Sequence, residues 1–381
     1  MSNRPVKIIY IFSFIERALL NEAIAEQLAK VKDFETGFIL LNRKPSSYST
    51  YLREKNFKTW DIFYAGKKNL ISALFKIFRI LFMERPDVIN TNLFDANVAG
   101  LIPAWLLGIK VRVLSRHHSS LHHVYHPGYV KFDKLLNSLA THIVSPSPSV
   151  SKILIEKEKV NPEKVILIPH GLPLDNFREV NQDRINTLIK KYFPAGKPYP
   201  VIGVISRLIH WKGIQYIIPA FRKLLDEFPN AHLLLANARG NYSNEIKKLL
   251  SEISSEKYTL IDFEEDSPAL YRLMDVFVHA PIDSHSEAYG QIYVEALASG
   301  IPSVFTLSGI ASEFVKHGRN AFVVPYKDAD AIFEGITKIL NDKSFRDLII
   351  SNGKSDVEAR YNETVMGNKL EALFRNAAQK K

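Results

Sequence analysis

The chain alternates short apolar runs with longer amphipathic stretches along most of its length. In the first half we expect strands at 7–13, 37–41, 87–90, 111–115, 142–145 and 165–169. The second half repeats the pattern, with strands expected at 201–206, 232–236, 259–262, 276–279, 303–305 and 321–324. Strands that alternate with helices form parallel sheets covered by helices on both faces. The pattern therefore predicts an α/β protein built on doubly wound, Rossmann-like parallel sheets.

A chain of 381 residues exceeds the size of one ordinary hydrophobic core, so two domains are expected. The segment 170–200 is rich in proline and includes a short helix at 183–191, which favours a linker there. We expect an N-terminal domain at 1–178 and a C-terminal domain at 179–359. The amphipathic end of the chain, about 360–381, could pack back on the N-terminal domain or stay with the other. Ligands of such sheets bind at the carboxyl ends of the strands, which predicts a cleft where the two domains face each other.

The absence of cysteine excludes disulfides, thiolate metal sites and cysteine nucleophiles, and it fits a cytoplasmic protein. No apolar run reaches the roughly 18 to 20 residues that span a bilayer, and the N-terminus shows no signal-peptide pattern. The net charge of +10 is unevenly placed. Residues 1–178 hold 25 Lys and Arg against 15 Asp and Glu, and the rest of the chain holds 25 of each. The N-terminal half is therefore expected to meet an anionic partner.

The anionic partner could be a lipid headgroup, a membrane surface or a nucleic acid. Nucleic acid is not expected, because the basic residues are dispersed and no recognition motif is present. The stretch 66–82 is helical in pattern, cationic and rich in aromatic residues. Such a helix can lie in the surface of an anionic membrane. It can equally cover one face of the sheet, so both interpretations stay open.

The first candidate site is the turn after the strand expected at 201–206. This turn carries Arg207 and Lys212, and a helix begins near Gly213. Two cations beside a helix N-terminus suit a diphosphate, since Arg offers a planar fork of donors and Lys a point charge. The alternative is an ordinary surface turn with two solvated cations.

The second candidate site lies between the strand expected at 276–279 and a helix that begins near Gln291. Gly290 allows the backbone to approach a ligand closely. The free N–H groups of Gln291, Ile292 and Tyr293 are expected to point at an anion. Glu287 and Glu295 flank this helix start and can accept hydrogen bonds from sugar hydroxyls. Glu295 can also be explained as an acid that complements the helix dipole.

Both candidate sites follow strands of the same domain, and four segments now carry a specific resemblance. They are Ser206-Arg207-Leu208 with Lys212-Gly213, the pair Glu287 and Glu295 with Gly290 between, Ala296-Leu297-Ala298-Ser299-Gly300-Ile301-Pro302, and Gly318-Arg319-Asn320-Ala321. In this order they resemble the donor-sugar domain of the retaining glycosyltransferases of family four, which have the GT-B fold. The resemblance covers most of residues 195–340 and extends loosely over the first half.

The resemblance implies a role for each matching residue in holding a nucleotide sugar. Arg207 and Lys212 are expected to bind the donor diphosphate, and Glu287 to contact the donor sugar. Backbone N–H groups after Gly290 are expected to hold phosphate, Glu295 to bind the ribose, and the backbone near Asp262 and Phe263 to meet the base.

In the first half, the family often has a histidine near the donor sugar after the strand that corresponds to 111–115. His118 is the first choice for this role and His117 the second. His170-Gly171 stands where the family commonly has Asn-Gly at the hinge between the domains.

Three further features emerge when the sequence is compared with the family pattern. Five histidines lie between His117 and His126, which suggests a metal site. We expect none, because these enzymes need no catalytic metal and no carboxylate cluster accompanies the histidines in the sequence. The family also has a glycine-rich turn after the first strand, whereas this chain has no glycine at 11–17. Ser13 is left as the candidate for the contact made there. The loop at 281–286 is longer and more polar than usual.

The sequence thus predicts a retaining hexosyl- or N-acetylhexosaminyl-type glycosyltransferase. Its donor is a nucleoside diphosphate sugar and its acceptor is a hydroxyl of a carbohydrate or a lipid-linked glycan. The expected setting is cell-surface polysaccharide, lipopolysaccharide or glycolipid synthesis in the cytoplasm, at the inner face of the membrane. A nucleotide-sugar epimerase, an inverting transferase and a non-catalytic membrane-associated protein are the alternatives.

Overall fold

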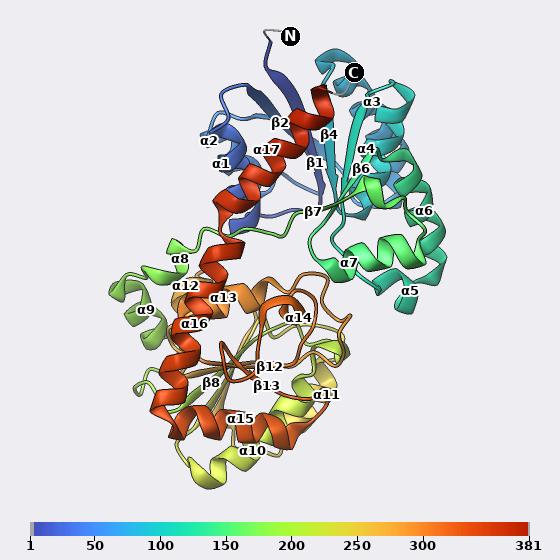
Figure 1. Cartoon of the computed structure of the whole chain (residues 1–381). Coiled ribbons are helices and arrows are strands. Elements are labelled where there is room, and N and C mark those ends of the chain that lie inside the picture. The colour runs from blue at the N-terminus through green and yellow to red at the C-terminus, as the bar shows by residue number, and fades with distance from the viewer. Residues whose placement is uncertain (1–3, 380–381) are drawn as a thin grey trace. The chain divides into compact units, whose positions relative to one another are not determined.

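A computed structural model describes residues 4–379 of the chain. It divides into two compact units (Figure 1). Unit 1 extends to Pro173 and resumes at Asn362, and unit 2 comprises Leu174–Tyr361. The division after Pro173 falls a few residues before the expected boundary at 178.

The strands of unit 1 form one parallel sheet of seven strands within the described residues. Their order across the sheet is β3-β2-β1-β4-β5-β6-β7. The strands are β1 (Val6–Ser13), β2 (Phe34–Asn42), β3 (Lys58–Phe63), β4 (Val88–Asn92), β5 (Val111–Ser115), β6 (His142–Ser145) and β7 (Val165–Leu167). The order reverses between β1 and β4, so the loops after these two strands diverge and leave room for a ligand.

The helices of unit 1 cover both faces of this sheet, as Figure 1 shows. Right-handed crossovers place α1 (Leu19–Ala29) and α2 (Ser47–Glu54) on one face, because β1, β2 and β3 step in one direction. The steps from β3 to β6 go the other way. They place α3 (Leu70–Glu84), α4 (Phe94–Leu106) and α6 (Val130–Leu139) on the opposite face.

Every strand expected from the sequence overlaps an observed strand, but β3 was missed. This strand is the edge of the sheet, and Lys58, Asp61 and Phe63 on it are exposed. An edge strand pairs on one side only and carries charges, so it lacks the apolar run that marks a buried strand.

The last helix, α17 (Glu363–Gln379), belongs to unit 1 and packs on α1. Its buried residues Leu370, Leu373 and Phe374 join the core formed by β1 and β2. Phe374 meets Tyr10 of β1 edge to face, with ring centroids 6.1 Å apart. The chain thus returns to its first domain at its end, because the apolar stripe of α17 completes the core there.

Unit 2 contains a parallel sheet of six strands within the described residues, in the order β10-β9-β8-β11-β12-β13. The strands are β8 (Val201–Ile205), β9 (His232–Ala236), β10 (Tyr258–Ile261), β11 (Val276–His279), β12 (Ser303–Phe305) and β13 (Phe322–Val323). The longer helices around this sheet are α10 (Ile214–Glu227), α11 (Ser243–Leu250), α13 (Gln291–Ser299), α15 (Ala329–Asn341) and α16 (Lys343–Tyr361). The order reverses between β8 and β11, which pair directly.

Most of the segment expected as a linker is folded into unit 2. It forms α8 (Asp175–Arg178) and α9 (Gln182–Tyr192), and α9 packs on α12 (Ser267–Tyr271). Arg184 binds Asp266 through a hydrogen bond of 2.7 Å from Nε to Oδ2. The prolines of this segment therefore mark the approach to β8 rather than a free linker.

We expect Phe374→Ala to destabilise unit 1 through the loss of core contacts at the return of α17. Truncation of a fully buried Phe costs about 3–5 kcal/mol. The free energy of unfolding can be followed by fluorescence of Trp60 and Trp105, which lie in unit 1, in urea. Leu348→Ala on α16, where the side chain is 51% exposed, is the matched control and should cost little. Equal effects of the two substitutions would show that α17 is not part of the core.

Candidate functional site

The two candidate segments of unit 2 follow the two strands that flank the reversal of its sheet. Arg207 and Lys212 come after β8, and Glu287 comes after β11. Because β8 and β11 pair in parallel, their carboxyl ends lie at the same edge of the sheet. The structure therefore brings Lys212 and Glu287 together at the position where doubly wound sheets bind ligands.

Lys212 and Glu287 form an ion pair that also includes His279, the last residue of β11. Lys212 Nζ donates to Glu287 Oε1, and His279 Nε2 lies 3.0 Å from the same oxygen. The side chains are only 16%, 12% and 1% exposed, respectively. The backbone N–H of Glu287 also donates to Ser308 Oγ, at 3.0 Å. This carboxylate is thus fixed in place from the loops after β8, β11 and β12.

The electrostatics of the cluster keep Glu287 ionised. Burial alone works to raise the pKa of Glu287, but the charge of Lys212 and the hydrogen bond from His279 outweigh it and lower that pKa to about 2. Burial lowers the pKa of His279, so this imidazole is neutral and donates through Nε2. The ammonium of Lys212 has three N–H donors, and its bond to Glu287 uses one of them.

The helix α13 begins beside this cluster. Gly290 precedes it with a φ of +84°, in the left-handed region, and a Cβ there would lie 2.7 Å from the ring of Tyr293. The backbone N–H groups of Gln291 and Ile292 have no acceptor among the described residues. The expectation of a third free donor was wrong, because the N–H of Tyr293 donates to the carbonyl of Gly290 at 3.1 Å. Two donors therefore remain at the positive end of this helix.

Glu295, one turn into α13, has different hydrogen-bond partners from Glu287. Tyr271 donates its hydroxyl to Glu295 Oε2 at 3.0 Å, and Gln291 Nε2 donates to Oε1 at 2.6 Å. The residue is 9% exposed, and burial raises the pKa of its carboxyl group. Each carboxylate oxygen keeps acceptor capacity beyond these bonds.

The other two predicted residues of unit 2 are exposed at the same edge of the sheet. Arg207 follows β8 and forms no ion pair among the described residues. Phe263 follows β10 and is 56% exposed, with the guanidinium of Arg239 5.4 Å from its ring centroid. A flat aromatic surface with a stacked Arg is able to receive a planar ring.

In unit 1, Ser13 lies at the carboxyl end of β1 and is 1% exposed. Its hydroxyl accepts a hydrogen bond of 3.3 Å from the N–H of Ala96, in the first turn of α4. The next residue, Phe14, has a φ of +51°. The backbone at this turn thus adopts a glycine-type conformation without a glycine, and Ser13 is engaged in capping α4.

The two candidate histidines follow β5 in unit 1. His117 Nε2 lies 3.1 Å from Asn92 Oδ1, at the end of the neighbouring strand β4, and its ring is 5.7 Å from that of His170. Burial lowers the pKa of His117 to about 4 and that of His170 to about 3. Both rings are therefore neutral at physiological pH.

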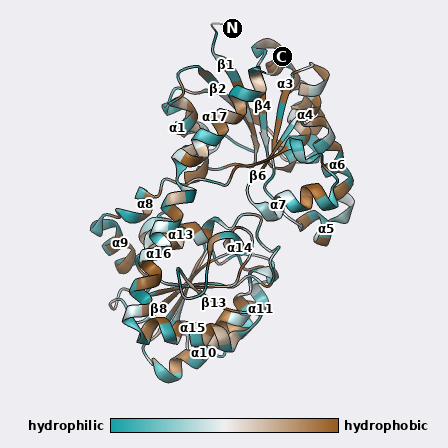
Figure 2. Cartoon of the chain, viewed as in Figure 1, coloured by the Kyte–Doolittle hydropathy of each residue, from teal (hydrophilic) through white to brown (hydrophobic). Residues whose placement is uncertain are grey.

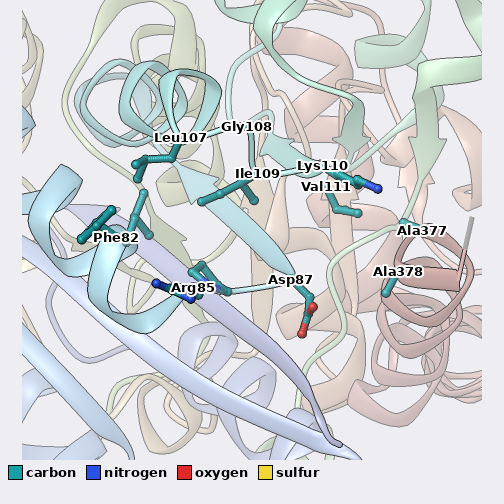
Figure 3. A pocket seen from close by; sticks show the side chains of 12 residues that line it. Phe82, Arg85, Asp87, Leu107, Gly108, Ile109, Lys110, Val111, Ala377 and Ala378 are labelled. Atoms are coloured by element: carbon teal, nitrogen blue, oxygen red, sulfur yellow. The ribbon is translucent and has the colours of Figure 1, made fainter. Parts of the chain in front are cut away.

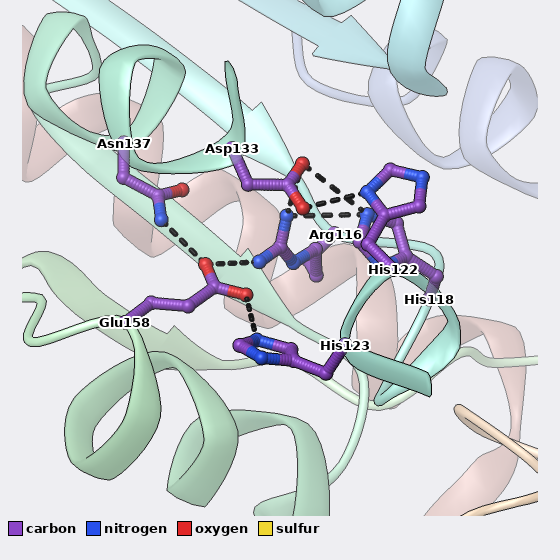
Figure 4. Close-up of polar contacts among 7 residues, drawn as sticks. All are labelled: Arg116, His118, His122, His123, Asp133, Asn137 and Glu158. Atoms are coloured by element: carbon purple, nitrogen blue, oxygen red, sulfur yellow. Dashed lines mark hydrogen bonds and ion pairs between the residues drawn. The ribbon is translucent and has the colours of Figure 1, made fainter. Parts of the chain in front are cut away.

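His118 belongs to a buried polar cluster centred on Arg116 (Figure 4). The guanidinium of Arg116 binds Glu158 through Nη2 and Asp133 through Nη1, the latter at 3.1 Å. His122 Nδ1 lies 2.6 Å from Asp133 Oδ2, and His123 Nε2 lies 3.2 Å from Glu158 Oε1. Arg116 and Glu158 side chains are 2% and 0% exposed, so the charges compensate each other inside the protein.

Arg116 also determines which nitrogen of His118 carries the proton. Arg116 Nη1 lies 3.2 Å from His118 Nε2, and a guanidinium can only donate. His118 Nε2 must then accept, which leaves the proton of the neutral ring on Nδ1. Burial lowers the pKa of His118 and the charge of Arg116 adds to this, although the negative charge of Asp133, whose Oδ1 lies 3.6 Å from Nε2, opposes them. His118 Nδ1 is buried and has no partner within the described part of the chain, so it presents an unused donor.

One of the two reasons for expecting no metal in the histidine-rich segment, the lack of accompanying carboxylates, was wrong. Ligand atoms of His118, His122 and Asp133 lie within 4.8 Å of one another, so a carboxylate does accompany the histidines. However, Arg116 already donates to Asp133 and His118. Its guanidinium supplies the positive charge at the place where a cation would have to bind.

Sequence reasoning missed four residues of these two clusters. His279 ended a predicted strand, and a polar side chain at the end of a buried strand was the available signal. Arg116 stood beside the chosen histidines, but Asp133 and Glu158 lie 17 and 42 positions beyond Arg116 in the sequence. Only the fold brings such distant residues together.

The two sheets and the ligand edge of unit 2 define a two-domain Rossmann-like protein of the GT-B type. Residues 22–176 match the model described as Glycosyltransferase Family 4, and residues 186–356 match Glycosyl transferases group 1. Together the two matches cover most of both units. The chain belongs to the group 1 glycosyltransferases of the family-four type.

Individual relatives agree with this assignment. The chain is 26% identical over 314 residues to the capsular polysaccharide biosynthesis glycosyltransferase CapM of Staphylococcus aureus, which covers 80% of each chain. It is 28% identical over 216 residues to a GDP-mannose-dependent monoacylated alpha-(1-6)-phosphatidylinositol monomannoside mannosyltransferase of Corynebacterium glutamicum, 55% of each chain. The crystal structure of Anabaena HepE in complex with UDP and glucose aligns with a TM-score of 0.82 at 18% identity, over 97% of this chain and 99% of the other.

We expect Lys212→Ala to make the stability of unit 2 depend less on pH in the acid range. A carboxylate with a lowered folded pKa stabilises the fold above its ordinary pKa of 4.5, and this contribution is lost as the pH falls toward about 2. Without Lys212, burial remains and the folded pKa of Glu287 rises toward or above its ordinary value, so this contribution is lost. The variant should therefore be less stable than the wild type at pH 7, and the difference should narrow as the pH falls. Urea unfolding followed by Trp211 fluorescence from pH 7 to pH 3 measures this. Lys223→Ala, which removes an exposed ion pair, should show the same pH profile as the wild type. A wild-type profile for Lys212→Ala would contradict the pairing of Lys212 with Glu287.

We expect His118 to carry its proton on Nδ1. In protein labelled with ¹⁵N-histidine, long-range ¹H–¹⁵N spectra above neutral pH distinguish the protonated from the unprotonated ring nitrogen, and His118→Gln assigns the signal. His123 is the internal control, because its Nε2 faces a carboxylate and should carry the proton. A protonated Nε2 on His118 would show that Arg116 does not set its tautomer.

Proposed function

We propose that this glycosyltransferase moves a sugar from a nucleoside diphosphate sugar to a hydroxyl acceptor, with retention of the anomeric configuration. The observation that carries the proposal is the cluster of Lys212, Glu287 and His279 beside the open N-terminus of α13. It combines an anchored carboxylate for sugar hydroxyls with cationic and backbone donors for a diphosphate, at the edge where doubly wound sheets bind ligands.

The diphosphate is held by charge and by directed donors. Lys212 has two N–H groups left after its bond to Glu287. Arg207, five positions earlier in the same turn, is exposed. The N–H groups of Gln291 and Ile292 add the positive end of α13. These groups also stabilise the charge that grows on the diphosphate as it departs, which is where electrostatic catalysis acts. With the charge balanced in this way, the reaction requires no catalytic metal.

The sugar and the nucleoside are recognised by carboxylate hydrogen-bond acceptors and by an exposed aromatic ring. Glu287 stays ionised and accepts hydrogen bonds from hydroxyls of the donor sugar. Glu295, held by Tyr271 and Gln291, accepts from the ribose. The backbone near Asp262 and the exposed Phe263 meet the base. The family resemblance assigns His118 to the surroundings of the donor sugar, and Ser13 stays in its capping role.

The chemical step requires no nucleophile from the protein. The bond between the anomeric carbon and the diphosphate oxygen breaks, and the acceptor oxygen bonds to the same face of that carbon. The departing diphosphate oxygen takes the proton of the acceptor hydroxyl. The family resemblance supports this front-face route, and so does the pairing of Glu287 with Lys212 and His279, which lowers its basicity and weakens it as a general base. Rate enhancement then comes from positioning and from charge stabilisation.

The names of the relatives support an acceptor in cell-surface polysaccharide or glycolipid synthesis. One acts in capsular polysaccharide biosynthesis and another on a phosphatidylinositol monomannoside. We assign the chain to hexosyl or N-acetylhexosaminyl transfer onto a carbohydrate or lipid-linked acceptor at the cytoplasmic side of a membrane. Among residues 4–379, no helix is long and apolar enough to cross a bilayer.

Lys212→Ala should lower kcat by about 10²–10³, because loss of one group that stabilises developing charge costs that much. The measurement is release of nucleoside diphosphate with a panel of nucleotide sugars and acceptors, with the fold checked by circular dichroism. Lys223→Ala on the neighbouring helix should keep wild-type turnover.

Analysis of the anomeric product by NMR completes the experiment. Retained configuration in the glycoside agrees with the proposal, and an inverted product would overturn the retaining route. A nucleotide sugar epimerised without acceptor, or wild-type turnover by Lys212→Ala, would overturn the assignment of the site.

A further inference from the structure

The helix α3 carries two apolar stripes, of which the sheet uses one. Ala73, Ile77 and Leu81 are buried and pack inward, which confirms that the helix covers unit 1. A second stripe contains Ile71, Phe75 and Phe82, which are 82%, 70% and 58% exposed. Their spacing of four and seven residues places them on one side of a helix, away from the buried stripe. A helix that only covers a sheet needs no second stripe.

Neighbouring helices extend this exposed apolar surface. The helices α3 and α4 pack together, as do α4 and α6, on one face of the sheet (Figure 1). Hydrophobic positions, in brown, recur along these helices in Figure 2. Besides the stripe on α3, the exposed apolar residues are Met83 on α3, Trp105 and Leu106 at the end of α4, Val124 and Tyr125 in α5 (Leu121–Tyr125), and Phe132 and Leu135 on α6. We call this set, together with the α3 stripe, the α3–α6 face.

The charge of this face is almost entirely positive. Residues 64–140 contain ten Lys and Arg but only four acidic residues. All four acids are engaged: Glu84 with Lys7 and Lys58, Asp87 with Arg4, Asp95 with Tyr64, and Asp133 with Arg116.

Eight of the ten cations, in contrast, are exposed, the exceptions being Arg112 on β5 and Arg116 in the buried cluster. Lys76 and Arg79 on α3, and Lys131 and Lys134 on α6, form no ion pair within the described chain. The N-terminal ends of α3 and α6 are linked by Lys67, whose ammonium lies 5.3 Å from the ring centroid of Tyr129. Unpaired cations therefore interleave with exposed aromatic side chains over the whole face.

A cavity of about 440 Å³ continues the face at the far ends of α3 and α4 (Figure 3). Phe82 and Leu107 line it together with Arg85 and Lys110. It lies next to the amino ends of β4 and β5, the opposite edge of the sheet from the candidate histidines. The cavity thus combines apolar and cationic groups, and it also contains Asp87, which pairs with Arg4.

From these observations we propose that the α3–α6 face docks on an anionic phospholipid surface. The Lys and Arg side chains bind the headgroup phosphates, and the exposed apolar side chains enter the boundary between headgroups and acyl chains. Charge complementarity selects this occupant, because a protein partner or a second copy of this basic face would have to bring its own acidic surface. The inference concerns unit 1 alone and does not rest on the sugar-transfer site of unit 2.

The test is co-sedimentation of the full chain with lipid vesicles at low salt. Vesicles of phosphatidylcholine with phosphatidylglycerol should bind the protein, pure phosphatidylcholine vesicles should bind it weakly, and rising salt should release it. Each basic residue near an anionic surface strengthens binding about fivefold. Lys76→Glu/Arg79→Glu should therefore weaken binding about 25-fold or more. Lys247→Glu/Lys248→Glu, exposed on α11 of unit 2, is the matched control and should bind as the wild type does.

A second pair of variants tests the apolar contribution. Phe75→Ser/Phe82→Ser should also weaken binding several-fold, whereas Leu260→Ser/Leu348→Ser, at exposed apolar positions of unit 2, should not. All four variants change exposed side chains, and circular dichroism checks that they fold. Equal binding by a face variant and its control would overturn the proposal, as would binding that ignores lipid charge. A dimer without lipid that Phe75→Ser/Phe82→Ser abolishes would identify a second copy as the occupant instead.

Discussion

The parallel pairing of β8 with β11 is the constraint on which the proposed donor site depends. It places the ends of two strands far apart in sequence at one edge, where the sheet order reverses. Lys212 and Glu287 are 75 positions apart and meet only for this reason. The same pairing fixes His279, which ends β11, against the carboxylate. A site assembled in this way inherits its rigidity from the backbone hydrogen bonds of the sheet.

Both polar clusters use a cation to hold carboxylates, a mostly buried Lys212 in unit 2 and a fully buried Arg116 in unit 1, but the two arrangements differ. In unit 2 one ammonium and one neutral imidazole share a single carboxylate, and donors remain free for a ligand. In unit 1 the guanidinium of Arg116 serves two carboxylates at once and leaves the imidazole of His118 as an acceptor. Replacement of Arg116 by Lys would not preserve this arrangement, since one ammonium lacks the planar fork that spans both acids.

Much of this architecture could be predicted from the sequence, because local patterns determine it. Alternating apolar runs predicted all strands except β3, whose edge position leaves it exposed and charged. The start of α13 at Gln291 was predicted from Gly290 and the apolar periodicity that follows. The convergence of Asp133 and Glu158 on Arg116 could not be predicted, since nothing in the local sequence relates these helices to the end of β5. The bond between Tyr293 N–H and Gly290 was likewise a matter of backbone geometry.

The two faces of the unit 1 sheet show that burial in the core does not by itself explain the hydrophobic residues of the chain. On one face, α17 fills the remaining space over β1 and β2, and its apolar residues are buried. On the other face, α3 packs against the sheet through three small or aliphatic side chains, whereas its Phe75 and Phe82 remain exposed to solvent. Exposed aromatic residues lower the solubility of a protein. A surface with several of them beside unpaired cations is typical of a surface that contacts a partner. The apolar residues of α3 therefore fall into two groups: one is buried against the sheet, and the other is exposed on the surface that we propose contacts a partner.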